Sequence, residues 1–207
     1  MTRFHADSAH FLRSAGFAIA ALLLAGCSVF PEAEPVVRLD PRIDVESGAH
    51  GPPLDLRVGL PRPEADPARD ADRVLVRTET GRLQVISNLR WVAPAPDLVQ
   101  TTLIRYLRDA GAFAEVTPGA RSVDRALFID LRRFELAETS GGLRVEIELD
   151  ARVLDAVSGL PLDRFKLLHE EPLASPGGAD VVAGFETALA DLAERIGARL
   201  HTLPAEP

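Results

Sequence analysis

Cys27 is the only cysteine in the 207-residue chain, so the thiol chemistry of this protein depends on one side chain. Leu24, Ala25 and Gly26 precede it and close the uncharged, apolar run Ala15–Ala25. A single thiol cannot form a disulfide within the chain, and its position near the N-terminus favours covalent modification during export over a role in a folded core.

The segment before Cys27 has the layout of an export signal. Arg3 and Arg13 precede an apolar run of about 11 residues, which is typical of a secretory signal and too short to cross a bilayer. Leu-Ala-Gly-Cys resembles the bacterial lipobox, which implies that residues 1–26 are removed and that Cys27 carries acyl chains. Three such chains suffice for stable attachment to a membrane. Ser28 stands where an aspartate would retain a lipoprotein in the inner membrane, so the resemblance implies the periplasmic leaflet of the outer membrane.

Little else in the chain predicts catalysis or metal binding. His50, His169 and His201 lie too far apart for a zinc motif, and the phosphate-binding, dinucleotide-binding and serine-nucleophile motifs are absent. Glu146 and Glu148 share one strand face and could act as an acid and a base, but alternating glutamates are more common on solvated faces. His169 begins a His-Glu-Glu sequence that we expect in a solvated loop. We therefore predict a protein that is not an enzyme and has no metal or cofactor.

Composition limits the partners and the source of stability. The chain has 31 acidic and 23 basic residues and a net charge of −8, which argues against binding to nucleic acid. Residues 27–207 are within the range of one domain. With Cys27 acylated, stability must come from packing rather than from a disulfide.

The predicted organisation is a signal peptide (1–26), an acylated, proline-rich tether (27–53) and one domain (54–203). Residues 36–39 could form a short first strand within the tether. A proline-rich loop is expected at Pro61–Pro67. Alternation predicts the strands Leu54–Val58, Arg73–Arg77, Arg82–Ile86, Ala126–Ala137, Leu143–Ala156 and Leu162–Glu170.

Two helices complete the predicted domain. The first follows Pro94 and Pro96 and ends at Gly111, and the second runs from Asp180, as the N-cap residue, to about Leu200. In the strand Ala126–Ala137 the apolar positions change parity, which predicts a bulge near Arg132–Arg133. We expect an α+β fold: a mixed, mostly antiparallel sheet, with its last three strands as a meander and two main helices packed on it.

Trp91 is the only tryptophan and lies in the segment Asn88-Leu-Arg90-Trp91, directly before the first helix. A large aromatic side chain at this junction favours a core or rim anchor over a contact with a partner, although either remains open. Asn88 and Arg90 are grouped with it as candidate partner residues.

Several segments together resemble one family. Beside the lipobox and the short strand at 36–39, the resemblance is carried by Asp72–Arg77, Asn88–Leu98, Leu107–Phe113, Leu127–Phe134 and Leu154–Gly159. In this order they are similar to the ABC-type transport auxiliary lipoproteins of the paraquat-inducible protein C type. The resemblance covers essentially the whole mature chain.

That resemblance implies a non-catalytic subunit anchored in the outer membrane. Its implied partners are an inner-membrane ABC permease, the ATPase of that permease and a mammalian-cell-entry (MCE) protein, which together move lipids or hydrophobic compounds between the membranes. A homo-oligomeric ring is compatible with this role. Two other classes stay open: a lipoprotein of another envelope assembly, such as a secretin pilot or Tol-like component, and a small-ligand carrier or enzyme in lipoprotein form.

Overall fold

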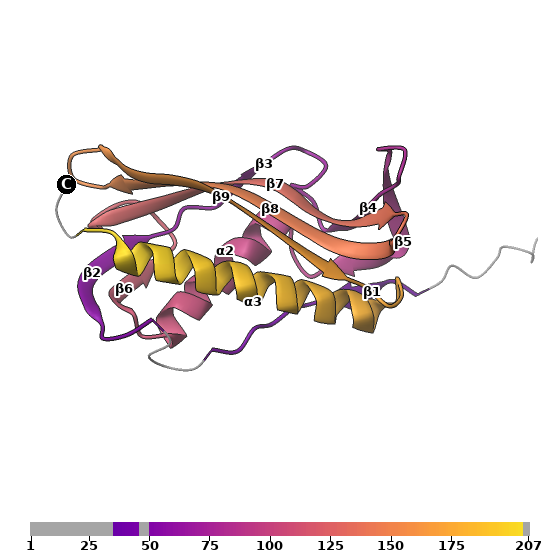
Figure 1. Ribbon diagram of the computed structural model, residues 1–207, viewed down its shortest axis with the longest axis horizontal. Coiled ribbons are helices and arrows are strands. Elements are labelled where there is room, and N and C mark those ends of the chain that lie inside the picture. The colour runs from indigo at the N-terminus through magenta and orange to yellow at the C-terminus, as the bar shows by residue number, and fades with distance from the viewer. Residues whose placement is uncertain (1–34, 46–49, 205–207) are drawn as a thin grey trace, which may run out of the picture. The chain divides into compact units, whose positions relative to one another are not determined.

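Strand β7 (Arg125–Thr139) organises the sheet, because both of its edges are paired in the computed structural model. The structure describes residues 35–45 and 50–204, and Val36 begins the compact unit that contains the sheet and helices (Figure 1). The described residues form nine strands and two helices. Besides β7, they are β1 (Val37–Leu39), β2 (Leu54–Gly59), β3 (Glu64–Ala65), β4 (Arg73–Arg77), β5 (Leu83–Trp91), α2 (Ala95–Asp109), β6 (Phe113–Thr117), β8 (Gly142–Asp155), β9 (Pro161–Pro172) and α3 (Gly178–Thr202).

The long strand pairs are antiparallel and the short ones are parallel. β7 pairs with β8 along its length and β8 pairs with β9, which confirms the predicted meander. On the other edge of β7, the strands β2, β3 and β4 pair in turn with its beginning, middle and end, all in parallel. β4 forms an antiparallel hairpin with β5, whose far edge carries β1. The sheet is therefore mixed, as predicted.

The predicted bulge is present and keeps the apolar residues of β7 on one face. Leu131 is opposite Leu149, while Arg133 is opposite Glu148, so Arg132 is the extra residue. Before the bulge the odd-numbered positions face the core, and after it the even-numbered ones do. Without this extra residue, Phe134 would point away from the helices.

Both helices cover the same face of the sheet. α3 lies along β8 and β9, with α2 beside it (Figure 1). The apolar stripe of α3 is buried as predicted and consists of Val181, Phe185, Ala188, Leu189, Leu192, Ile196 and Leu200. α2 begins with Ala95 and Pro96, and Gly111 follows it with φ of +64°, a value that suits glycine after a helix.

Three local predictions need correction. Asp180 is not the N-cap of α3; Gly177 is, and Asp180 lies in the first turn, where it accepts a hydrogen bond from Ser175 Oγ at 2.6 Å. The proline-rich loop contains the two-residue strand β3, and an additional strand, β6, follows α2. Both are held by parallel pairing to distant strands, β7 and β2 respectively.

Candidate functional site

The predicted lipidation residues Leu24, Ala25, Gly26 and Cys27 lie outside the described residues, and acylation of Cys27 stays a prediction. Nearby in the chain, β1 is part of the domain sheet. Val37 and Leu39 are opposite Leu89 and Trp91 of β5. Part of the predicted tether, β1, is thus fixed to the same strand that carries Trp91.

Trp91 is fully buried and forms part of the core. Its ring meets Phe134 of β7 and Phe185 of α3 edge-on, with ring centroids 5.4 and 4.7 Å apart. The indole nitrogen has no hydrogen-bond partner among the described residues. Trp91 therefore joins the hairpin, the central strand and the last helix, and offers no ring surface to a partner.

Arg90 and Asn88 do not form one site with Trp91. Arg90 Nη1 donates to the carbonyl oxygens of Leu89, Ile86 and Ser87 at 2.7, 3.2 and 3.3 Å, so it braces its own strand. Asn88 lines two open, largely apolar grooves of about 660 and 710 Å³ at the N-terminal end of α3. Of the three residues, Asn88 alone borders a space that a partner could enter.

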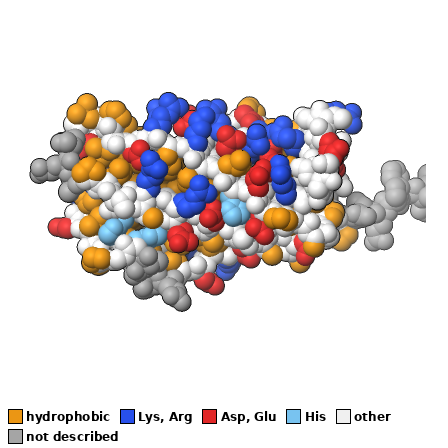
Figure 2. Space-filling model, viewed as in Figure 1, with side chains coloured by type: hydrophobic (Ala, Val, Ile, Leu, Met, Phe, Trp, Pro, Cys, Tyr) orange, Lys and Arg blue, Asp and Glu red, His pale blue; other side chains and the backbone are white. Residues whose placement is uncertain are grey.

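The face of the sheet opposite the helices carries paired charges. Basic side chains gather on the strand side of the domain with acidic ones between them (Figure 2). Glu146 accepts hydrogen bonds from Arg133 Nη1 and from Arg144 Nε, each at 2.8 Å, while Glu148 forms an ion pair with Arg133 Nε at 3.0 Å. Because arginine donors occupy these carboxylates, the pair is poorly placed to exchange protons with a substrate.

Glu135 is the most deeply buried carboxylate of this face. It is fully buried and pairs with Arg69, which is 8% exposed, and with Arg77, whose Nε lies 2.7 Å from Oε1. Arg69 follows β3, Arg77 ends β4 and Glu135 lies on β7. The trio therefore fastens the β3–β4 connection to the central strand.

Other ion pairs link the sheet to its surroundings. The hydrogen bond from Arg164 lowers the pKa of Asp150, and the hydrogen bond from Arg199 of α3 lowers the pKa of Asp163 on β9. His169 lies inside β9, not in the solvated loop we expected, and its Nδ1 is 2.8 Å from Asp191 Oδ2 on α3. These contacts serve helix packing and pairing between strands.

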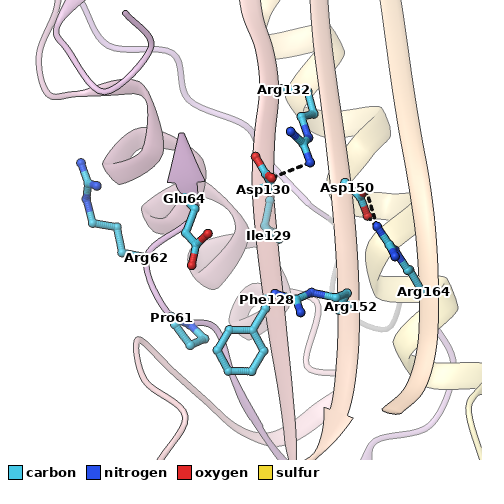
Figure 3. Close-up of a pocket in the computed structure, with 10 residues that line it drawn as sticks. All are labelled: Pro61, Arg62, Glu64, Phe128, Ile129, Asp130, Arg132, Asp150, Arg152 and Arg164. Carbon is cyan, nitrogen blue, oxygen red and sulfur yellow. Dashed lines mark hydrogen bonds and ion pairs between the residues drawn. The ribbon is translucent and has the colours of Figure 1, made fainter. Parts of the chain in front are cut away.

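One groove, called here the β3 groove, lies on the helix-free face (Figure 3). It has a volume of about 270 Å³ and is lined by Pro61, Arg62, Glu64, Phe128, Ile129, Asp130, Arg132, Asp150, Arg152 and Arg164. Glu64 points toward β7, Arg152 lies across β7 beside Phe128, and Arg62 points away. Arg62 is held at Nε by Asp97 of α2 at 2.6 Å.

Within residues 35–45 and 50–204, no cluster of three or more histidine, cysteine or acidic side chains is placed to hold a metal ion. No helix in the same ranges is long and apolar enough to cross a membrane.

The fold is similar to that of solved structures. A Xanthomonas campestris protein of the DUF330 family matches with a TM-score of 0.73 and 27% identity, covering 80% of this chain and 95% of its own. A hypothetical protein from Chlamydia trachomatis matches with a TM-score of 0.54 and 10% identity, over 72% of this chain and 98% of its own, which shows the fold alone. No curated protein gives a significant match.

The fold, with its ion-paired charges on one face of the sheet and its open grooves, defines an α+β domain of the kind found in that Xanthomonas protein. Residues 38–197 match the ABC-type transport auxiliary lipoprotein component family, and the chain belongs to it. It is accordingly an auxiliary lipoprotein component of an ABC-type transport system, lipid-anchored in the cell envelope, in a family that is generally non-catalytic.

Proposed function

We propose that this protein is the outer-membrane-anchored subunit of an MCE-type ABC system that moves lipids or hydrophobic compounds between the inner and outer membranes. The observation that carries the proposal is the extent of the family match. Residues 38–197 reach from β1 into α3, so the auxiliary fold accounts for nearly the whole described domain. The protein would then act through its anchor and its surfaces.

The site geometry supports a binding role over a catalytic one. Glu135, Glu146 and Glu148 are held by arginines, and the largest grooves described here are open to solvent. An open groove suits a protein partner better than a cargo that must be shielded from water. The expected partners are the MCE-domain protein, the permease and the ATPase, with a ring of copies as one assembly that this surface could form.

The anchor is tested by Cys27→Ser in the full-length chain. We expect the wild type in the outer-membrane fraction of a density gradient and the variant unprocessed or soluble, because it lacks the acylated thioether. A variant that still fractionates with the outer membrane after a high-salt wash would contradict the anchoring proposal. Wild type in the inner-membrane fraction would contradict the part based on Ser28.

The partners are tested by pull-down of the solubilised, acylated wild type, with mass spectrometry of the captured proteins. We expect an MCE-domain protein, a permease and an ATPase from one transport system. Recovery of a secretin or of Tol components instead would support the other envelope assemblies. Cys27→Ser serves as the control for capture that does not depend on membrane attachment.

A further inference from the structure

The β3 groove exists because the edge of β7 is paired discontinuously. Gly59 of β2 is opposite Ala126, and the next pair on this edge is Glu64 of β3 opposite Asp130. Four residues of the incoming chain therefore pass three residues of β7. Two of the four, Pro61 and Pro63, lack the N–H that a strand partner would need, so the connection bows away from Phe128 and leaves a hollow.

Two of the charged groups that line this hollow have no partner. The side chains of Glu64 and Arg152 make no hydrogen bond or ion pair with any residue in the described part of the chain, and they do not pair with each other. Both point into the groove, on either side of Phe128 (Figure 3). Elsewhere on this face, arginines and carboxylates are brought together, as in the buried trio of Glu135.

The neighbouring charges are paired but keep unused donors. Arg132 Nη2 lies 2.8 Å from Asp130, and Arg164 binds Asp150 through Nε and Nη2 at 3.3 and 3.0 Å. Each guanidinium carries five N–H donors, so both can make further hydrogen bonds toward the groove.

The charge balance selects the kind of ligand. Arg132, Arg152 and Arg164 are matched by Glu64, Asp130 and Asp150, while Arg62 is occupied by Asp70 and Asp97. A bare anion would meet carboxylates, and a bare cation would meet guanidinium groups. A molecule with one charge of each sign can satisfy Arg152 and Glu64 together, and the volume of about 270 Å³ restricts it to a small group.

We propose that the β3 groove binds a small zwitterion in which a primary ammonium is joined by a short linker to a phosphate. Arg152 binds the phosphate, because guanidinium donors match phosphate oxygens in pairs, and the free donors of Arg132 and Arg164 add to this contact. Glu64 binds the ammonium beside the Phe128 ring, whose face also attracts a cation. The inference goes beyond the proposed function and does not depend on it.

Isothermal titration of the full-length protein in maltoside detergent, which carries neither group, tests the proposal. The probes are phosphoethanolamine, ethanolamine and inorganic phosphate. We expect phosphoethanolamine to bind at least tenfold more tightly than either half, because each half leaves one of the two charges unmatched. Failure to detect phosphoethanolamine binding at millimolar concentration, or equal binding of inorganic phosphate, would overturn the proposal.

Single variants test which side chain binds the phosphate of the ligand and which binds its ammonium group. Arg152→Gln should weaken phosphoethanolamine binding about tenfold or more, and Glu64→Gln should remove its advantage over inorganic phosphate. Both side chains are exposed and unpaired, so their loss should leave the fold intact. Arg121→Gln and Glu138→Gln, which also change exposed charges but outside the groove, are the controls. Equal weakening by the controls would refute the assignment.

Glycerophosphoethanolamine distinguishes the two sources of this chemistry. A phospholipid presents its phosphate as a diester, whereas a soluble metabolite presents a monoester. Binding of the diester as tight as that of phosphoethanolamine supports a lipid headgroup as the ligand. Binding of the monoester alone supports a soluble phosphate compound. The wild type and Arg152→Gln are compared with both probes, and a diester or monoester affinity that Arg152→Gln leaves unchanged contradicts the site.

Discussion

Replacement of Trp91 by alanine should destabilise the domain severely, although it changes no side chain on the surface. The ring is fully buried and packs against two phenylalanines, and truncation of such a residue typically costs about 3–5 kcal/mol. One contribution acts in the other direction. The indole N–H has no acceptor among the described residues, and a buried donor of this kind costs about 1–3 kcal/mol, which the variant recovers. We therefore expect a loss near 3 kcal/mol.

Trp91→Phe separates these two contributions. It keeps an aromatic ring against Phe134 and Phe185 but removes the unsatisfied donor, so its cost should be about 1 kcal/mol or less. Val92→Ala, at a neighbouring side chain that is 43% exposed, is the control and should change stability by no more than about 0.5 kcal/mol.

The measurement is urea unfolding of the full-length protein followed by far-ultraviolet circular dichroism, together with thermal unfolding. For a domain of this size, a loss of about 3 kcal/mol lowers Tm by roughly 6–12 °C. The fluorescence of Trp91 in the wild type should shift to longer wavelength on unfolding. A loss below about 1 kcal/mol for Trp91→Ala, or equal losses for alanine and phenylalanine, would refute the account of the core given above.

Three further substitutions test packing, ion pairing and titration. In Gly59→Ala the new Cβ would lie 2.0 Å from the carbonyl oxygen of Gly119, so this variant should fail to fold or lose several kcal/mol, whereas Gly119→Ala meets open space and should be nearly neutral in thermal unfolding. Glu135→Ala removes the buried carboxylate that binds Arg69 and Arg77 and leaves Arg69 with Asp66 as its partner, so it should cost about 1.5–3 kcal/mol in urea unfolding; a cost like that of a surface substitution would contradict it. Burial lowers the pKa of His50 below 6.5, so the unfolded chain takes up the proton first and the free energy of unfolding should fall as pH drops below about 6.5. His50→Gln should remove that part of the slope, and an unchanged pH profile would exclude it.

The predictable elements were those whose own residues carry a long pattern. β7, β8 and α3 have extended alternation or a helical stripe, and even the bulge at Arg132 is visible as a change of parity. β3 and β6 are short and parallel, and their pairing partners are far away in the chain. Their stability comes from tertiary contacts that no local pattern records.

The functional surfaces were less predictable for the same reason. The sequence showed that even-numbered residues of β8 form a polar face, but not that Glu135 would be enclosed by arginines 66 and 58 residues away. It also grouped Trp91, Arg90 and Asn88 by proximity along one strand. Successive side chains of a strand point to opposite faces of the sheet, so Trp91 and its neighbour Arg90 lie on different faces. Trp91 is in the core and Asn88 borders a groove.

The helix-free face therefore contains both side chains fixed by ion pairs and charged side chains that have no partner. Glu135 and Glu146 are each held by two arginines, and these contacts fix the side chains across neighbouring segments of the sheet. Glu64 and Arg152 differ from these ion-paired residues. Their side chains remain unpaired because the chain bows out at Pro61. The carboxylates of Glu135 and Glu146 would have to give up contacts with arginine to bind a ligand, whereas Glu64 and Arg152 need not. Recognition on this face should therefore begin at the β3 groove, where binding displaces only water.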